Sequence, residues 1–88
     1  MSELEELRKQ IDQADAEILG GFKKRLEVCR KIAEYKKENG LPVFDAEREK
    51  QVIQNRRAAL DLPQTEELFD CIMKICRNYQ HSVSEDEK

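Results

Sequence analysis

Two cations lie within the apolar rows of a predicted helix. In the stretch RLEVCRKIAEYK (25–36), Arg25 stands in one row between Gly21 and Val28, and Lys36 ends a second row. Positions with this separation differ by about 20° around a helix and by ~16 Å along its axis. Arg25 and Lys36 therefore face one common trough. Each side chain could extend to water along its aliphatic stem, or the two together could hold an anion.

The other two predicted helices also carry polar groups on their apolar faces. Glu49 stands one turn before an apolar pair, and Gln80 ends an apolar row of the last helix. Asp45 and Arg48 form a cluster with Glu49 at the start of the second helix. Each has an ordinary explanation, as a helix cap, a surface ion pair or a polar residue at a frayed end. Because buried polar groups need partners, we interpret their recurrence on all three helices as a pocket for a small anion.

Composition narrows the class of protein. Of 88 residues, 40% are charged and 39% are hydrophobic, with three Gly and two Pro. This mixture favours amphipathic helices, so we predict one all-α domain over residues 1–83 and a disordered tail over 84–88. The net charge of −3 argues against a nucleic-acid partner. No signal peptide or apolar run near transmembrane length is present, so we expect no membrane partner.

The cysteines and the histidine do not suggest a metal site. Cys29, Cys71 and Cys76 match no zinc-binding spacing, and His81 lies near the tail with no triad or ligand cluster around it. We interpret the cysteines as reduced thiols that serve as small apolar residues. That interpretation implies a reducing compartment, and we expect a cytoplasmic location.

The apolar spacing predicts three helices, one long and two shorter. The first covers 3–38, the second follows Asp45 as its N-cap to about residue 60, and the third begins with Thr65 as a cap. Gly20–Gly21 interrupts the first helix. The pair predicts either a kink or a place where another backbone or a ligand approaches closely.

The length of the first helix indicates assembly with another chain. A helix of this length spans ~54 Å, whereas a compact chain of this size has a radius of gyration near ~12 Å. Its apolar stripe needs cover along the whole length, and a second copy of the chain in a two-fold dimer is the simplest cover. Arg8 lies ~25 Å along the axis from Arg25, so it could join Arg25 only from a partner chain.

The order of motifs along the chain resembles a known family. LRKQIDQADAEIL, KKRLEVCRKIAEYK, PVFDAEREKQVI and LFDCIMKICRNYQ are similar to the successive helices of the all-α chorismate mutases, the AroQ class, over about residues 4–82. The resemblance implies an intertwined helical homodimer. It also implies that each active site is built mainly from one chain and receives Arg8 from the other.

The resemblance further implies that chorismate is rearranged to prephenate within one molecule. Such a reaction needs no metal, cofactor or nucleophile. Lys36, Gln80 and Arg25 would be the catalytic residues. The full set of substrate-binding residues would be Arg8, Arg25, Lys36, Asp45, Arg48, Glu49, Cys76 and Gln80.

Each of these residues has an expected role in holding the compact shape of the substrate. Arg25 and the partner's Arg8 would hold the two carboxylates. Lys36 and Gln80 would donate to the ether oxygen as negative charge develops there. Glu49 would accept a hydrogen bond from the substrate hydroxyl.

Three further positions have less specific expectations. Asp45 would help to shape the hydroxyl end, and Arg48 would pair with Glu49 or assist a carboxylate. Cys76 stands where the family often has a small polar residue, so a hydrogen bond from this position is open.

Two alternatives remain at this point. An isochorismate pyruvate lyase on the same fold would bind a similar dianion, although Glu49 suits the hydroxyl of the mutase substrate better. A non-enzymatic helical dimerisation module would carry the same charges as solvated groups. From Met1 and the polar tail we expect a monofunctional chain with no regulatory domain.

Overall fold

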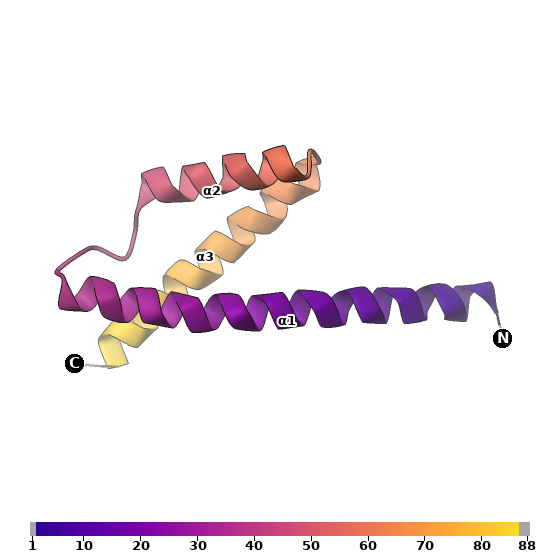
Figure 1. The fold of residues 1–88 in the computed structure, drawn as a ribbon, viewed down its shortest axis with the longest axis horizontal. Helices are drawn as coiled ribbons and strands as arrows, with labels where there is room; N and C mark the ends of the chain where they lie inside the picture. The colour runs from indigo at the N-terminus through magenta and orange to yellow at the C-terminus, as the bar shows by residue number, and fades with distance from the viewer. Residues whose placement is uncertain (1, 87–88) are drawn as a thin grey trace.

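The computed structural model describes residues 2–86, with side chains described as far as residue 83, and shows three helices (Figure 1). They are α1 at Glu3–Glu38, α2 at Ala46–Ala59 and α3 at Pro63–Asp86. No strand occurs within residues 2–86. The predicted all-α class, with one long and two shorter helices, is confirmed.

Local capping explains why α1 begins and ends where it does. Ser2 Oγ accepts a hydrogen bond from the Glu5 backbone N–H at 3.1 Å, and acidic residues occupy the first turn. At the other end, the Asn39 amide group donates to the Tyr35 carbonyl oxygen, and Gly40 adopts a φ of 65°. A left-handed Gly directly after a helix is a common stop signal. The predicted bounds of this helix are therefore confirmed.

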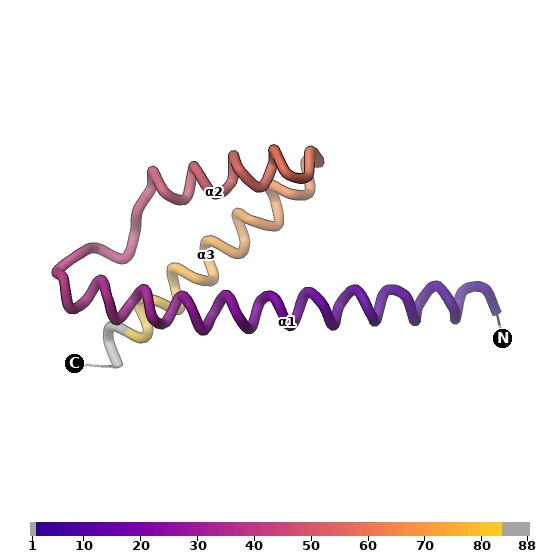
Figure 2. Tube along the Cα trace, in the orientation of Figure 1, coloured from indigo at the N-terminus to yellow at the C-terminus, as the bar shows by residue number. Residues whose placement is uncertain are grey.

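Gly20–Gly21 does not bend the long helix. α1 continues past this pair without a kink (Figure 2), so that interpretation was wrong. A Cβ atom built at either glycine would meet no atom within 4 Å. Nothing in the described part of the chain approaches the pair closely.

The second and third helices begin differently from each other. Asp45 Oδ1 accepts from the Arg48 backbone N–H at 3.0 Å, which confirms the predicted cap of α2. The prediction of Thr65 as the cap of α3 was wrong, because α3 already begins at Pro63. The fixed φ of proline suits the first position of a helix, where no N–H is required. Thr65 instead lies buried within the first turns, and its Oγ1 has no hydrogen-bond partner among residues 2–83.

The far end of α3 overlaps the expected tail. The helix extends as far as Asp86, and residues 87–88 lie outside the described residues. The division into a domain at 1–83 and a disordered tail at 84–88 stays a prediction.

The three helices form an open arrangement with α3 in the middle. Within the described residues, α3 packs against both α1 and α2, while α1 and α2 do not pack against each other. The front half of α1 extends beyond the other helices (Figure 1), and the molecule measures 56 × 28 × 14 Å. Its radius of gyration is 16.5 Å, larger than a compact chain of this length would have. The small core consists of Cys29, Ala33, Val52, Met73 and Cys76.

Candidate active site

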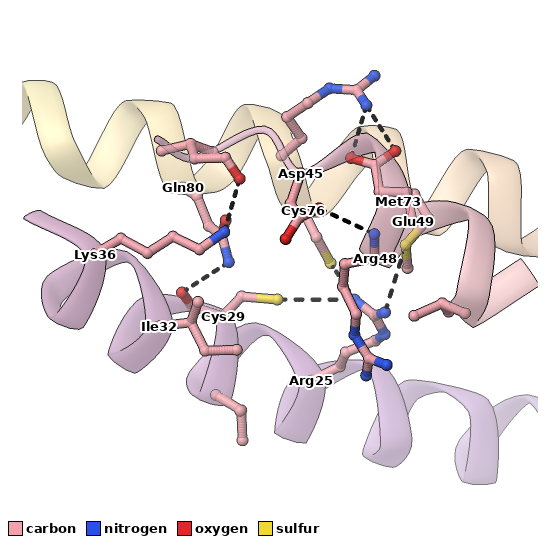
Figure 3. A pocket seen from close by; sticks show the side chains of 14 residues that line it. Arg25, Cys29, Ile32, Lys36, Asp45, Arg48, Glu49, Met73, Cys76 and Gln80 are labelled. Carbon is pink, nitrogen blue, oxygen red and sulfur yellow. Dashed lines mark hydrogen bonds and ion pairs between the residues drawn. The ribbon is translucent and has the colours of Figure 1, made fainter. Parts of the chain in front are cut away.

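A cavity of about 380 Å³ opens between α1 and α2 and is closed on one side by α3 (Figure 3). Its volume falls at the lower end of the range for small-molecule sites. Seven of the eight predicted site residues line it: Arg25, Lys36, Asp45, Arg48, Glu49, Cys76 and Gln80. The helices thus bring together residues that are up to 55 positions apart in the sequence.

The charges of the cavity differ from those of the whole chain. Its cations are Arg25, Lys36, Arg48 and Arg77, and its only carboxylates are those of Asp45 and Glu49. The lining therefore carries a surplus of two positive charges, although the chain carries a net charge of −3. A small molecule with two negative charges would be matched by this lining.

One end of the cavity presents nitrogen donors from two helices. Lys36 Nζ donates to the Val43 carbonyl oxygen at 2.8 Å, and Gln80 Nε2 donates to the Cys29 carbonyl oxygen at 3.2 Å. An ammonium has three donors and a side-chain amide nitrogen has two, so neither group is used up by these bonds. Gln80 is only 8% exposed, and its bond to α1 holds the amide beside Lys36.

The other end contains two guanidinium groups, those of Arg25 and Arg48 (Figure 3). Arg25 Nη1 donates to Cys76 Sγ at 2.8 Å and to Cys29 Sγ at 3.7 Å, while Nη2 lies 4.0 Å from Met73 Sδ. Thiol and thioether sulfurs are weak acceptors. A carboxylate would accept from the same guanidinium much more strongly. In the structure the Cys76 sulfur accepts from Arg25, and a hydrogen bond from Cys76 to a substrate stays open.

The thiol of Cys29 stays neutral at ordinary pH. Burial raises its pKa from 9.0 to about 11, and a hydrogen bond with the Cys76 side chain acts in the same direction. The nearby Arg25 guanidinium opposes this shift but does not overcome it. The Cys29 sulfur therefore adds no negative charge beside Arg25, so the positive surplus of the cavity is preserved.

Glu49 has a partner that the sequence argument did not name. Arg77 Nη1 lies 2.8 Å from Glu49 Oε1 and 2.9 Å from Oε2, and the Arg77 guanidinium stands 5.0 Å from the centre of the Phe44 ring. Within residues 2–83 Glu49 pairs with Arg77 and not with Arg48, so the other role expected for Arg48, toward a substrate carboxylate, stays a prediction. A signal was available, since Arg77 stands one helical turn before Gln80 and so shares its face.

Arg8 is the one predicted site residue outside the cavity. It lies on the front half of α1, where every residue from 3 to 20 is exposed. With ~25 Å of helix between it and Arg25, it cannot reach the cavity of its own chain. A role of Arg8 in a binding site would therefore have to be toward another molecule.

Comparison with known proteins agrees with this geometry. The family model for chorismate mutase type II matches residues 7–81, which include most of α1 and α3 and the whole of α2. This chain belongs to the chorismate mutase type II family. The match contains all eight predicted site residues, although their roles are not tested by it.

Named relatives extend the family assignment. A chorismate mutase from Methanocaldococcus jannaschii is 31% identical over 86 residues, which are 98% of this chain and 69% of that protein. A 4-amino-4-deoxychorismate mutase from Streptomyces pristinaespiralis is 36% identical over 80 residues, which are 84% of this chain and 62% of that protein. A solved structure, a conserved hypothetical protein from Pyrococcus furiosus, is 38% identical with a TM-score of 0.78 and covers 91% of this chain and 97% of its own.

Several curated relatives are much longer than this chain. It spans between 15% and 23% of the length of several curated relatives. In the part of the chain that the structure describes, no helix is both long and apolar enough to cross a membrane. The same residues contain no group of three or more metal-ligating side chains.

Proposed function

We propose that this chain catalyses the rearrangement of chorismate to prephenate. The observation that carries the proposal is the charge of the cavity, in which four cations and two carboxylates face a volume of about 380 Å³. Chorismate has two carboxylates, an ether oxygen and a hydroxyl, so it matches a lining with two surplus positive charges. Membership of the chorismate mutase type II family supports the same reaction.

The two ends of the cavity suit different parts of this substrate. Arg25 and Arg48 would receive carboxylate oxygens, which would replace the weak sulfur acceptors of Arg25. Lys36 and Gln80 would donate their remaining N–H groups to the ether oxygen as its bond to carbon breaks. Donors fixed in advance at such a position stabilise the transition state more than the bound substrate.

The carboxylates of the cavity would serve the hydroxyl of the substrate. Glu49 keeps lone pairs free after accepting from Arg77, so it can still accept from an O–H group. One oxygen of Asp45 accepts a hydrogen bond from the Arg48 backbone N–H, and the Asp45 side chain would limit the space at this end. Neither carboxylate needs to transfer a proton, because in the rearrangement the ether C–O bond breaks as a new C–C bond forms and no hydrogen moves.

We further propose that two copies of the chain form a homodimer. Leu4, Leu7, Ile11 and Ile18 make a stripe along the front half of α1 that is 48–62% exposed. Continuous apolar surface of this kind is uncommon on a monomer, and a second α1 has the matching length and pattern. Such pairing would bring the partner's Arg8 to the carboxylate end. Replacing Ile11 with Asp should yield a monomer in sedimentation, and a dimer with unchanged dissociation constant would contradict this assembly.

The free thiols of Cys29, Cys71 and Cys76 are compatible with a reducing compartment, and we propose a cytoplasmic location. A fusion of the full chain to a fluorescent protein would report its place in the cell. Export of the fusion would contradict this location.

The direct test of the proposed reaction is spectroscopic. Purified protein is added to chorismate, the decrease in chorismate absorbance is followed, and the product is identified as prephenate by its conversion to phenylpyruvate in acid. Isochorismate is offered in parallel. If the protein forms salicylate from isochorismate but no prephenate from chorismate, it is a lyase and not a mutase. If micromolar protein consumes no chorismate, the proposal is overturned.

A further inference from the structure

The Arg77–Glu49 pair is held in place from two sides. Both oxygens of Glu49 accept from the same Arg77 nitrogen, at 2.8 and 2.9 Å, and the guanidinium lies over the Phe44 ring at 5.0 Å. The side chains are 30% and 23% exposed, and both line the cavity. Contacts with a carboxylate and with an aromatic face restrict the guanidinium to one position. Arg77 is therefore a fixed charge of the site rather than a mobile surface arginine.

This pairing changes what Glu49 can recognise. A carboxylate without a cationic partner in the cavity would bind an ammonium group more strongly than a neutral O–H group. Once Arg77 balances its charge, Glu49 remains a hydrogen-bond acceptor but no longer offers an unbalanced negative charge. Of the remaining charges of the cavity, the three cations Arg25, Lys36 and Arg48 outnumber the single carboxylate of Asp45, so the local field stays positive.

We propose that Arg77 determines substrate specificity by making the cavity select a hydroxyl over an ammonium group at the substrate position that faces Glu49. The proposal rests on the proposed function and on the contact expected there between Glu49 and the hydroxyl. An analogue with an amine at that ring carbon carries a positive charge at neutral pH. This ammonium group would lie beside Glu49 and close to the Arg77 guanidinium. Two positive charges near each other in a partly buried site repel.

The substrate analogue that tests this selectivity carries an amine in place of the hydroxyl. A relative that is 36% identical is named for 4-amino-4-deoxychorismate, which differs from chorismate by an amine in place of the hydroxyl. The two molecules share both carboxylates and the ether oxygen. Any change in preference between them therefore reports on the environment of this one substituent.

The experiment compares the two substrates in variants of the full chain. Arg77→Met keeps the long stem and removes the charge, whereas Arg77→Lys keeps the charge. For each variant, kcat/KM is measured for chorismate and for 4-amino-4-deoxychorismate, and inhibition of chorismate turnover replaces kcat/KM where turnover of the amine is slow. The specificity ratio is kcat/KM for 4-amino-4-deoxychorismate divided by kcat/KM for chorismate. In Arg77→Met this ratio should rise about tenfold or more, because Glu49 regains an unbalanced charge. In Arg77→Lys it should stay within about threefold of the parent.

A matched control separates local from general charge effects. Arg30→Met removes the same charge from the exposed side of α1, outside the cavity, and should leave the ratio unchanged. A second variant, Glu49→Gln, removes the negative charge of the acceptor while Arg77 stays. It should lower the ratio below that of the parent chain. This variant provides the test if Arg77→Met does not fold, which circular dichroism would show.

The outcomes distinguish this inference from the proposed function. If the parent converts chorismate but the ratio is unchanged in Arg77→Met and in Glu49→Gln, Arg77 is a structural ion pair and the inference is overturned. If both variants lose activity for the two substrates in equal proportion, the same conclusion holds. If the parent converts neither substrate, the proposed function itself is overturned, and this inference with it.

Discussion

The two halves of α1 have the same apolar spacing but different surroundings. In the front half, residues 3–20, every residue is exposed, and no other described part of the chain covers the stripe of leucine and isoleucine. In the back half, Cys29 and Ala33 are buried against α3, and Arg25 and Lys36 line the cavity. One continuous helix thus lines a cavity with its back half and leaves an apolar stripe exposed on its front half.

The difference shows how a short chain can build a polar site with few helices. An open arrangement of three helices buries only a small core, so the back half of α1 has space for a cavity rather than a packed interior. The front half of α1 contributes no residue to this cavity. Under the proposed dimer, it covers a second copy and contributes Arg8 there.

The largest expected effect lies in the back half. Lys36→Met should lower kcat/KM for chorismate by about 10²–10³-fold, because it removes the donor proposed for the developing charge on the ether oxygen. Steady-state kinetics with the chorismate absorbance measures this effect. Lys31→Met, which changes an exposed lysine outside the cavity, serves as the control and should stay near the parent. A loss below tenfold would remove Lys36 from the catalytic role.

The next effect links the two halves across the proposed dimer. Arg8→Ala should lower kcat/KM by about 10–100-fold, as should Arg25→Ala, because each removes a cation that would hold a carboxylate. After the two variants are unfolded together and refolded, mixed dimers contain one intact site, and activity should recover to about a quarter of the parent.

A matched mixture shows whether this recovery depends on the chain of origin. Arg25→Ala mixed with Lys36→Ala should give no recovery, because both residues line the same cavity of one chain. Recovery in this mixture, or its absence in the mixture with Arg8→Ala, would contradict the contribution of Arg8 across the interface.

A smaller effect concerns the buried thiol of the back half. Because the pKa of Cys29 is about 11 in the folded chain and 9.0 without burial, the unfolded chain loses this proton first as the pH rises. The thiol therefore does not alter the pH dependence below pH 9. Between pH 9 and 11 it should reduce the free energy of unfolding by about 1–2 kcal/mol, which allows for solvent screening.

Denaturant titrations at pH 8, 9, 10 and 11 measure this contribution. Cys29→Ala should lose this part of the pH dependence, whereas Cys71→Ala, which changes an exposed thiol, should keep it. If the free energy of unfolding depends on pH in the same way in both variants, the burial of Cys29 has no such effect.

The smallest effect lies at the boundary between the halves. Gly21→Ala should raise the free energy of unfolding by about 0.5–1 kcal/mol, because alanine favours a helix and nothing lies within 4 Å of the added Cβ. Thermal unfolding at several protein concentrations measures the change. A lower melting temperature that depends on concentration would instead indicate that the backbone of a partner chain approaches Gly21.

Much of the secondary structure was predictable because its causes are local. The bounds of α1 follow from apolar spacing, charged end turns and the Asn39–Gly40 stop, all of which are visible in the sequence. The Asp45 cap of α2 was predicted in the same way, and the common trough of Arg25 and Lys36 follows from helix geometry alone. The start of α3 was mispredicted, because Pro63 also suits the first position of a helix and Thr65 lies buried within the first turns.

The contacts between helices were less predictable. That Arg77 pairs with Glu49, and that Arg25 donates to Cys76, depends on where α3 crosses the other two helices. Neighbouring candidates such as Arg48 were equally available from the sequence. The choice among them requires the crossing position of the helices, which periodicity does not contain.

By itself, the sequence determined the helices, the face on which each polar side chain lies and the resemblance to a family. These properties depend on spacing along one chain and on capping between near neighbours. The tertiary structure alone decided which charges meet in the cavity, that Glu49 is balanced by Arg77, and that the front half of α1 remains uncovered. The reason is physical, because electrostatic pairing and burial depend on distances between helices that are far apart in the sequence.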